Sequence, residues 1–503
     1  MTGRTEPPGG TTIDLPSHSD PVVAGLSEVI GGPIGMHARL SRLYWTPMRI
    51  VLGLATFAFA LNWIQKSPCR DGRWADNIQY TKQCYTDVLA LYYAEHLSDG
   101  AVPYVDHPVE YPVLTGYFMG ILGLPVHWLG SQDWLNKSVL PALAKVGLAQ
   151  GGPMNQGKVF YDVNAIALAL FGLLSVWAIV SMRPRRPWDG AMVALAPAVF
   201  VTASVNWDLL VVGLTSLFLY SWSKKKLVLA GIFLGLAISA KFYPLFIVGP
   251  LLLLCIRRRK LPEFGQLFGV AAITWVAANL PVIVVARGAW EKFYSFNQDR
   301  GIDWGTFWYI GGHFQIGRFK PDLPFFATLG SDQNHDLLNN LSLGFFVVAC
   351  VGIAALVFLA PRPPRLGQLA FLVVAAFLLT NKVWSQQFVL WLIPLAVLAR
   401  PRWLMFLIWQ VFELGYFYAF YQILLRSSGG KSALPEAMFT YAAIARWVSL
   451  AVLCGLVVRE SLRPELDVVR ASGEDDPEGG VLTDPDPEPT APEHHPEEAI
   501  AVA

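Results

Sequence analysis

Charged residues are scarce in this sequence, and their scarcity excludes an ordinary soluble protein. Only 15% of the 503 residues are charged, whereas 54% are hydrophobic. A soluble chain of this length carries about a quarter charged residues. Several apolar stretches are also long enough to cross a bilayer. The composition therefore predicts an all-α polytopic membrane protein surrounded by membrane lipids. No basic face or nucleic-acid motif is present, so we expect no nucleic-acid partner.

The sequence also lacks the motifs of nucleotide-dependent and hydrolytic chemistry. It has no Gly-Lys-Ser/Thr phosphate-binding loop, no Rossmann glycine fingerprint and no Gly-x-Ser-x-Gly nucleophile elbow. These absences argue against a cytoplasmic nucleotide sugar as the direct substrate. The His and Cys residues are not spaced as zinc ligands. We expect no cofactor and no bound metal, although a role for a divalent cation stays open.

Cysteine is rare as well, with five residues in the chain. Three of them lie in apolar spans and are interpreted as small core residues: Cys255, Cys350 and Cys454. Cys69 and Cys84 share the first loop, which we expect to be extracytoplasmic. Because that location is oxidising, a disulfide between them is predicted, with two free thiols as the alternative.

The alternation of apolar runs and basic clusters predicts about twelve crossings with both termini in the cytoplasm. The first run, 48–64, follows several arginines, and basic clusters recur where later helices return. Residues 189–204 are expected to form one of the crossings. Several spans are short, so we expect some helices to stop midway. Residues 113–129 are broken by glycines and Pro125, and we expect them to form an interfacial or re-entrant helix on the outer side.

Three regions follow from this topology. Residues 1–43 are expected to form a disordered cytoplasmic segment, 44–460 the membrane domain, and 461–503 a disordered, acidic, proline-rich cytoplasmic tail. Within the membrane domain, two outer loops at 66–161 and 287–337 far exceed the usual connection length. Loops of that length are commonly functional.

Polar residues that interrupt the apolar chain gather on the predicted outer side. Ionisable groups at membrane depth are costly and are functional candidates by default. The candidates are Asp87, Asp106, Glu110, Asp208, Lys241, Arg300, His313, Lys382, Trp384 and Gln387. Some of them also have a purely structural interpretation. Asp208 suits the start of a helix, and Lys241 could extend to the membrane interface.

Asp87 is the strongest of these candidates. It begins a predicted amphipathic surface helix, Asp87–Leu97, directly above the expected membrane mouth. Asp106 and Glu110 have helical spacing, but Pro108 and Pro112 oppose a helix there. We therefore expect an extended segment in which one of these acids binds substrate hydroxyls.

At these residues the chain resembles the polyprenyl-phosphate-dependent glycosyltransferases of the GT-C superfamily. It looks closest to glycosyltransferase family 87, the actinobacterial mannosyltransferases. The resemblance runs from about residue 45 to 460 and is carried by Tyr85-Thr86-Asp87, Glu110-Tyr111-Pro112, Asn206-Trp207-Asp208, Lys241-Phe242-Tyr243-Pro244 and Lys382-Val383-Trp384-Ser385-Gln386-Gln387. Two departures are the long segment 131–160 and Gln386, where a proline is expected. They leave the subfamily, and hence the acceptor, open.

The resemblance implies a GT-C fold, a catalytic carboxylate and a phosphate-binding cation. Asp87 would take the proton from an acceptor hydroxyl as general base. The leaving polyprenyl phosphate would be stabilised by Arg300, Lys241 or Lys382, in that order of preference. His313 is a second candidate proton acceptor, and a structural histidine is an equal alternative. Direct displacement with inversion would need only one essential carboxylate.

The implied donor is a polyprenyl-phosphate sugar, in the first instance mannose. The implied acceptor is a glycolipid, a polysaccharide or a protein of the cell envelope, outside the cell membrane. Two alternatives stay open. A lipid-linked arabinose transferase of the same fold would differ only in a few hydrogen bonds to the sugar. A lipid or glycolipid transporter without chemistry would be expected to show inverted repeats, and none is convincing here.

Overall fold

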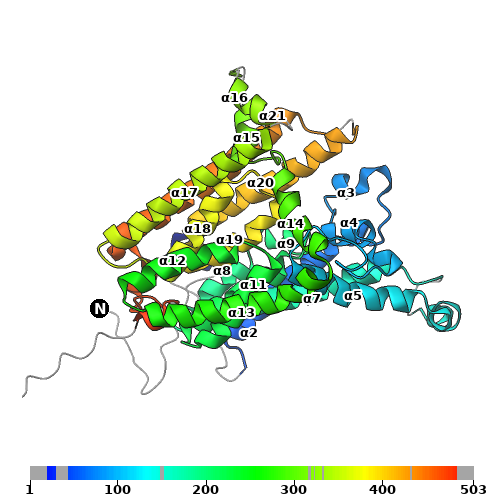
Figure 1. The fold of residues 1–503 in the computed structure, drawn as a ribbon, viewed down its shortest axis with the longest axis horizontal. Coiled ribbons are helices and arrows are strands. Elements are labelled where there is room, and N and C mark those ends of the chain that lie inside the picture. Colours follow the sequence, from blue (N-terminus) through cyan, green and yellow to red (C-terminus); the bar gives the residue numbers. More distant parts are fainter. Residues whose placement is uncertain are drawn as a thin grey trace, which may run out of the picture.

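The computed structural model describes residues 20–29, 44–147, 152–314, 319–321, 323–330, 334–430 and 433–483. These described residues are 76% helical and form no strand beyond an isolated bridge between Pro103 and His107. The elements form one helical bundle with short helices packed at its ends (Figure 1). This arrangement is that of an all-α polytopic membrane protein of GT-C type, as the sequence predicts.

Within the described ranges, seven helices are long and apolar enough to cross a membrane by length and composition. They are α2 (Pro47–Gln65), α5 (Val113–Gly130), α7 (Gln156–Met182), α13 (Leu261–Val285), α17 (His335–Leu359), α20 (Trp403–Ser427) and α21 (Glu436–Leu462). Five shorter apolar helices lie between them. These are α10 (Asp208–Ser223), α11 (Leu227–Ala240), α12 (Pro244–Arg257), α18 (Leu366–Thr380) and α19 (Val389–Ala399). Helices of 11 to 16 residues are shorter than a bilayer core requires, as the short predicted spans suggested.

The core of the bundle is formed by the short helices. All of α19 is buried, and α10 and α18 are buried along most of their length. A helix that is apolar on every side suits such a position. The long helices α13 and α17 instead expose large apolar side chains such as Val284 and Val348. Outward-facing apolar side chains on helices of this length are what a lipid environment favours.

The predicted crossing at 189–204 is wrong as a single helix. The structure divides it into α8 (Gly190–Ala194) and α9 (Val199–Thr202). Pro197 lies between them, lacks a backbone N–H and disfavours helical geometry in the residue before it. The helix predicted at 113–129 is present as α5, and its placement relative to a membrane stays a prediction.

Short helices cover the two ends of the bundle. Those near the loops are α3 (Ile78–Thr81), α4 (Asp87–Ala94), α6 (Leu140–Lys145), α14 (Arg287–Asp299), α15 (Phe307–Gly312) and α16 (Pro324–Leu329). Those near the termini are α1 (Pro21–Val29) and α22 (Val468–Ala471). Figure 1 shows α3, α4 and α14 towards one end of the bundle and the red C-terminal segment at the other. We call these the loop end and the tail end.

Parts of both terminal regions differ from the predicted disorder. Residues 20–29 contain α1, and the Asp20 carboxylate accepts a hydrogen bond from the Trp403 N–H at 3.3 Å. Residues 464–483 pack on the tail end, where Val481, Leu482 and Glu478 are buried. The acidic composition suggested a solvated tail, but these acids meet buried arginines of the bundle. The remainder of both terminal regions lies outside the described residues.

Candidate active site

The start of α4 is joined to the turn that precedes α10. Thr86 caps α4, because its hydroxyl accepts a hydrogen bond from the Val88 N–H. The same hydroxyl donates to the Ser204 carbonyl at 2.7 Å. The Asp87 N–H donates to the Val205 carbonyl, also at 2.7 Å. These bonds place the Asp87 side chain, the first of α4, beside the turn at 204–207.

The Asp87 carboxylate has two polar partners. Asn206 Nδ2 donates to Asp87 Oδ2 at 2.8 Å, and the Tyr85 hydroxyl also bonds the carboxylate. Burial raises the pKa of Asp87 above its ordinary value, and the two hydrogen bonds oppose that rise. Asn206 is itself bonded to the Tyr111 hydroxyl at 2.6 Å. A partly desolvated carboxylate with a raised pKa is suited to accept a proton.

Asp87 lines a cavity of about 390 Å³ at the loop end. Its wall contains two acids, Asp87 and Glu110, and two cations, Lys241 and Arg300. Most of the remaining wall is aromatic, with amide side chains among the rings. The aromatic members are Tyr85, Tyr111, Phe242, Tyr243, Phe246, Phe293, Phe296, Phe377, Phe388 and Trp391. Rings and amides are suited to hold a sugar, and cations are suited to hold a phosphate.

Lys241 is held in this wall by a buried carboxylate. Asp208 Oδ1 accepts hydrogen bonds from Lys241 Nζ and from Trp391 Nε1, both at 2.6 Å. Asp208 is fully buried and is the first residue of α10. The Lys241 ammonium also lies 5.0 Å from the Phe388 ring centre and 5.3 Å from that of Trp391. Asp208 therefore starts a helix, as its structural interpretation proposed, and also orients a pocket cation.

Glu110 and Arg300 complete the charged part of the wall. Burial raises the pKa of Glu110, and the negative charges of Glu95 and Asp87 raise it further. Arg300 lies near Glu110 and opposes that rise. The Arg300 guanidinium is partly exposed and lies 3.7 Å from the Asp303 carboxylate. It is therefore a partly exposed cation in the pocket wall, suited to bind an anionic group.

Two predicted candidates lie outside this pocket wall. Asp106 is exposed, and its carboxylate accepts a hydrogen bond from the Val102 N–H at 2.9 Å within a turn. His313 stacks on Tyr309 at 4.0 Å between ring centres and lies 3.6 Å from the Glu436 carboxylate. Each therefore has a local structural partner away from Asp87.

Lys382 and Trp384 lie behind the wall rather than in it. Lys382 Nζ donates to the carbonyls of Gln298 at 2.9 Å and Arg300 at 2.5 Å, and so joins two segments of the pocket. Burial lowers the pKa of Lys382 to about 8. Trp384 is fully buried. Gln387, the last of the predicted candidates, does line the cavity.

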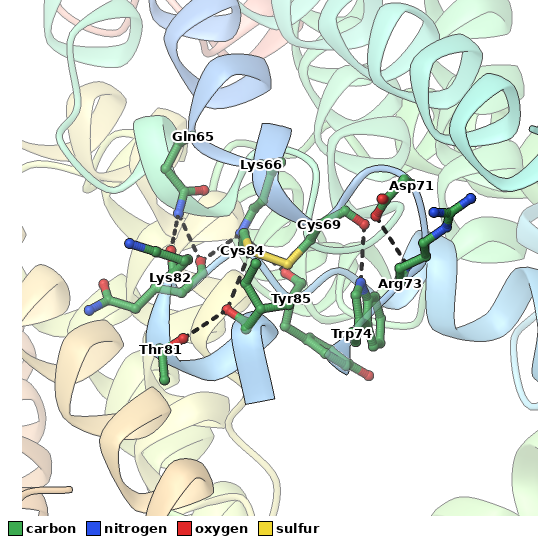
Figure 2. The surroundings of a disulfide bond; sticks show 12 residues. Gln65, Lys66, Cys69, Asp71, Arg73, Trp74, Thr81, Lys82, Cys84 and Tyr85 are labelled. Carbon is green, nitrogen blue, oxygen red and sulfur yellow. Dashed lines mark hydrogen bonds between the residues drawn. A yellow bond between two sulfur atoms is a disulfide. The ribbon is translucent and has the colours of Figure 1, made fainter. Parts of the chain in front are cut away.

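The segment before Asp87 is fastened by a disulfide and a buried lysine (Figure 2). The expected bond between Cys69 and Cys84 is present, with an S–S distance of 2.07 Å. Lys66 Nζ donates to the carbonyls of Gln83 at 3.4 Å and Tyr85 at 3.2 Å. Burial lowers the pKa of Lys66 to about 7, and the charge of Asp87 partly offsets that effect. Together these contacts hold the backbone from Gln83 to Tyr85.

Several residues of the site were not predicted from the sequence. Tyr85 and Asn206 bond the Asp87 carboxylate, and Tyr111 bonds Asn206. Each of the three belongs to a short motif that also contains a predicted candidate. Glu413 of α20 and Arg446 of α21 form an ion pair between two long apolar helices. A carboxylate in one apolar span and an arginine in the next were the signal for that pair. Among the described residues, no group of three or more His, Cys, Asp or Glu side chains is arranged to hold a metal ion.

Fold and site together define a class: a helical membrane protein with a pocket at one end of its bundle, lined by carboxylates, cations and aromatic rings. Residues 153–381 match the model of glycosyltransferase family 87. This match spans slightly less than half of the chain, shows a similarity to this family, and supports a membrane glycosyltransferase. The match covers Asp208, Lys241 and Arg300, whereas Asp87 and Lys382 lie outside it. No curated protein was found that matches the chain.

Proposed function

We propose that this glycosyltransferase moves a sugar, in the first instance mannose, from a polyprenyl phosphate to a cell-envelope acceptor. The transfer proceeds with inversion and takes place on the extracytoplasmic side of the cell membrane. A glycolipid, a polysaccharide or a protein would each supply the hydroxyl that the reaction needs. This proposal rests on the similarity to glycosyltransferase family 87 for the class of reaction and on the pocket for its mechanism.

Asp87 carries the proposal. It is the pocket carboxylate whose raised pKa, with amide and phenol hydrogen bonds, suits a general base. In the reaction, the acceptor oxygen forms a bond to the anomeric carbon and its proton passes to Asp87. The bond from the anomeric carbon to the phosphate oxygen breaks, and the polyprenyl phosphate leaves with the electron pair. A single displacement of this kind inverts the anomeric configuration.

The leaving phosphate needs positive charge close to it. Arg300 and Lys241 both line the pocket, and we assign this role to them. Arg300 offers a planar fork suited to phosphate, and Lys241 a point charge held by Asp208. Lys382 does not line the cavity, and its ammonium is bonded to backbone carbonyls. We therefore propose a positioning role for Lys382.

We place the pocket outside the cytoplasm for two reasons. Arg183, Arg365 and Arg400 all lie at the tail end, where their side chains pair with acids. Basic residues prefer the cytoplasmic side of a membrane protein. The disulfide beside the pocket suits an oxidising compartment. Both termini would then be cytoplasmic.

The test is sugar transfer from a short-chain polyprenyl-phosphate mannose to a membrane glycolipid extract. Wild type is compared with Asp87→Asn and with the control Asp106→Asn, whose carboxylate lies outside the wall. We expect Asp87→Asn to fold but to lose about 10²–10⁴-fold in kcat, the usual contribution of a general base. Asp106→Asn should keep wild-type transfer.

Two results would change the proposal. Wild-type kcat in a folded Asp87→Asn protein would remove Asp87 from the role of base. Absence of mannose transfer by wild type, followed by transfer from the arabinose donor, would assign the protein to the alternative lipid-linked sugar.

A further inference from the structure

A buried ion pair joins the two long helices that end the membrane domain. Arg446 on α21 and Glu413 on α20 are 0% and 3% exposed, and Arg446 Nε lies 2.9 Å from Glu413 Oε2. Removing two charges from water costs several kcal/mol for each ion. Ionised groups within apolar spans are therefore functional candidates unless their contacts explain them.

The remaining donors of Arg446 point to the pocket wall. Its NH1 group donates to the Trp384 carbonyl at 3.1 Å, and its NH2 group to the Ser385 carbonyl at 3.2 Å. The guanidinium lies 4.0 Å from the Trp384 ring centre and 4.1 Å from that of Tyr416. The rigid, planar fork of arginine suits two carbonyls and two rings at once, whereas a lysine ammonium does not.

Those two carbonyls belong to a non-helical segment. Between α18 and α19 the chain from Asn381 to Ser385 is not helical. Only its ends continue the neighbouring helices, through the Asn381 N–H bonded to the Phe377 carbonyl and the Ser385 carbonyl bonded to the Phe388 N–H. Non-helical backbone at membrane depth persists only where it is buried in protein or lines a cavity. Asn381, Val383 and Ser385 of this segment line the pocket. Gln387 and Phe388, in the 3-10 turn that follows, line it as well.

We propose that Arg446 is a positioning residue for the pocket. It holds the Val383–Phe388 wall in the shape that receives the substrate, and Glu413 fixes its guanidinium for that task. The competing possibility is that the pair only fastens α20 to α21. The identity of the substrate rests on the proposed function, but the positioning of the wall does not.

Thiol labelling separates the two possibilities without any activity measurement. Ser385→Cys places a thiol on the wall of the purified, full-length protein, and its labelling rate by a maleimide reports how open the wall is. The labelling rate is compared between Ser385→Cys alone and Ser385→Cys combined with the double variant Glu413→Leu and Arg446→Leu. Replacement of a buried ion pair by apolar residues is commonly neutral for folding.

We expect labelling to become at least tenfold faster in the double variant, with thermal unfolding close to that of wild type. An unchanged rate in a folded double variant would overturn the proposal and leave the pair as a helix fastener. If the double variant does not fold, the same labelling measurement is made on Arg446→Lys. It keeps the charge next to Glu413 but cannot bond both carbonyls, so a faster rate is again expected and an unchanged rate again contradicts the proposal.

Arg257 provides the matched control. Its guanidinium also donates to two backbone carbonyls, those of Val357 and Ala360. It lies at the C-terminal end of α12, whereas Tyr243 and Phe246, at the other end, line the pocket. With a rise of about 1.5 Å per residue, that separation is on the order of 15–20 Å. Arg257→Leu should therefore leave the labelling rate unchanged.

A kinetic measurement links the pair to catalysis. In Arg446→Lys, we expect the KM for the lipid-linked donor to rise at least fivefold and the pH profile that reports Asp87 to keep its shape. Labelling that changes while no transfer is detected in wild type would count against the proposed function alone. Labelling and KM that both stay at wild-type values would count against the positioning role alone.

Discussion

The pKa of Asp87 depends on contacts with two neighbouring side chains. Burial raises the pKa, and hydrogen bonds from Asn206 and Tyr85 oppose that rise. A general base acts only when it is deprotonated. Transfer should therefore be present above the pKa of Asp87 and be lost as the pH falls through it. Since that pKa is raised, the loss should occur above the ordinary range of an aspartate.

Asn206→Leu should move the acid limb of kcat/KM to higher pH. The substitution removes a hydrogen bond to the carboxylate, which is worth about 1.5–3 kcal/mol for a charged group. At 1.36 kcal/mol per pKa unit, the limb should move by about one to two pH units. The measurement is a pH profile of transfer with the donor below its KM.

Asn297→Leu is the control for that profile. Asn297 also lines the pocket, but its amide donates to the Phe293 carbonyl rather than to Asp87. Its acid limb should match wild type. A limb that stays in place in Asn206→Leu would show that another group governs the pH dependence.

At the scale of elements, the pocket is a meeting of segments that are not continuous helix. The start of α4, the turn before α10 and the segment between α18 and α19 all contribute to its wall. Cations bond backbone carbonyls at three points around the pocket: Lys66 bonds Tyr85, Lys382 bonds Gln298 near the end of α14, and Arg446 bonds Ser385. The helices thus supply a rigid frame, and the cations attach the irregular segments to it.

Loss of the Cys69–Cys84 disulfide should destabilise the first of these segments. The two cysteines are 15 residues apart, and closing a loop of that size is worth about 3 kcal/mol in the chain-entropy model. The variant Cys69→Ser with Cys84→Ser should therefore unfold at a lower temperature in a thermal scan. Reductant should lower the unfolding temperature of wild type but not that of the variant. An equal effect on both proteins would contradict a role for this bond.

At the scale of the whole molecule, the two ends of the bundle have different tasks. Asp208, at the start of α10, is at the pocket, whereas the Trp222 indole, near its other end, donates to the Gly479 carbonyl at 2.9 Å. Asp208 and Trp222 are 14 positions apart on this helix, which corresponds to about 21 Å. The segment 464–483 therefore closes the end opposite to the site. Its carboxylates form ion pairs with the buried side chains of Arg183 and Arg365.

Glu478→Gln should lower the stability of the protein. The Glu478 carboxylate is fully buried between the side chains of Arg183 and Arg365. Removing one partner of a buried pair costs roughly 3–5 kcal/mol. Thermal unfolding of the purified protein measures the effect. Glu474→Gln is the control, because its partner Arg185 is half-exposed and 3.8 Å away, and such a pair contributes about 0–1 kcal/mol. Equal unfolding temperatures for all three proteins would show that the segment is not anchored there.

The two ends should also lie on opposite sides of the membrane. A thiol introduced at the exposed position Arg73, near the disulfide, should react with an impermeant maleimide on intact cells. A thiol at the exposed position Lys225, after α10, should react only after the membrane is opened. The reverse pattern would invert the proposed orientation and place the pocket in the cytoplasm.

The sequence by itself determined the class of the molecule and much of its outline. Low charge and long apolar runs required helices in a bilayer, because only such helices satisfy their backbone in hydrocarbon. The apolar pattern located most of the helices, although it missed the break at Pro197. The position of Cys69 and Cys84 in one loop indicated their disulfide. Asp87 was singled out because it starts a predicted surface helix within the long first loop, directly above the expected membrane mouth.

Only the tertiary structure decided which candidates meet. Asp87, Glu110, Lys241, Arg300 and Gln387 share one cavity, whereas the other predicted residues lie behind or away from it. Sequence patterns report the period of an element, but not how elements cross. The roles of Asn206, Arg446 and Glu478 depend on partners 33 to 295 residues away in the chain. Contacts over such separations leave no local periodicity, so only the folded chain reveals them.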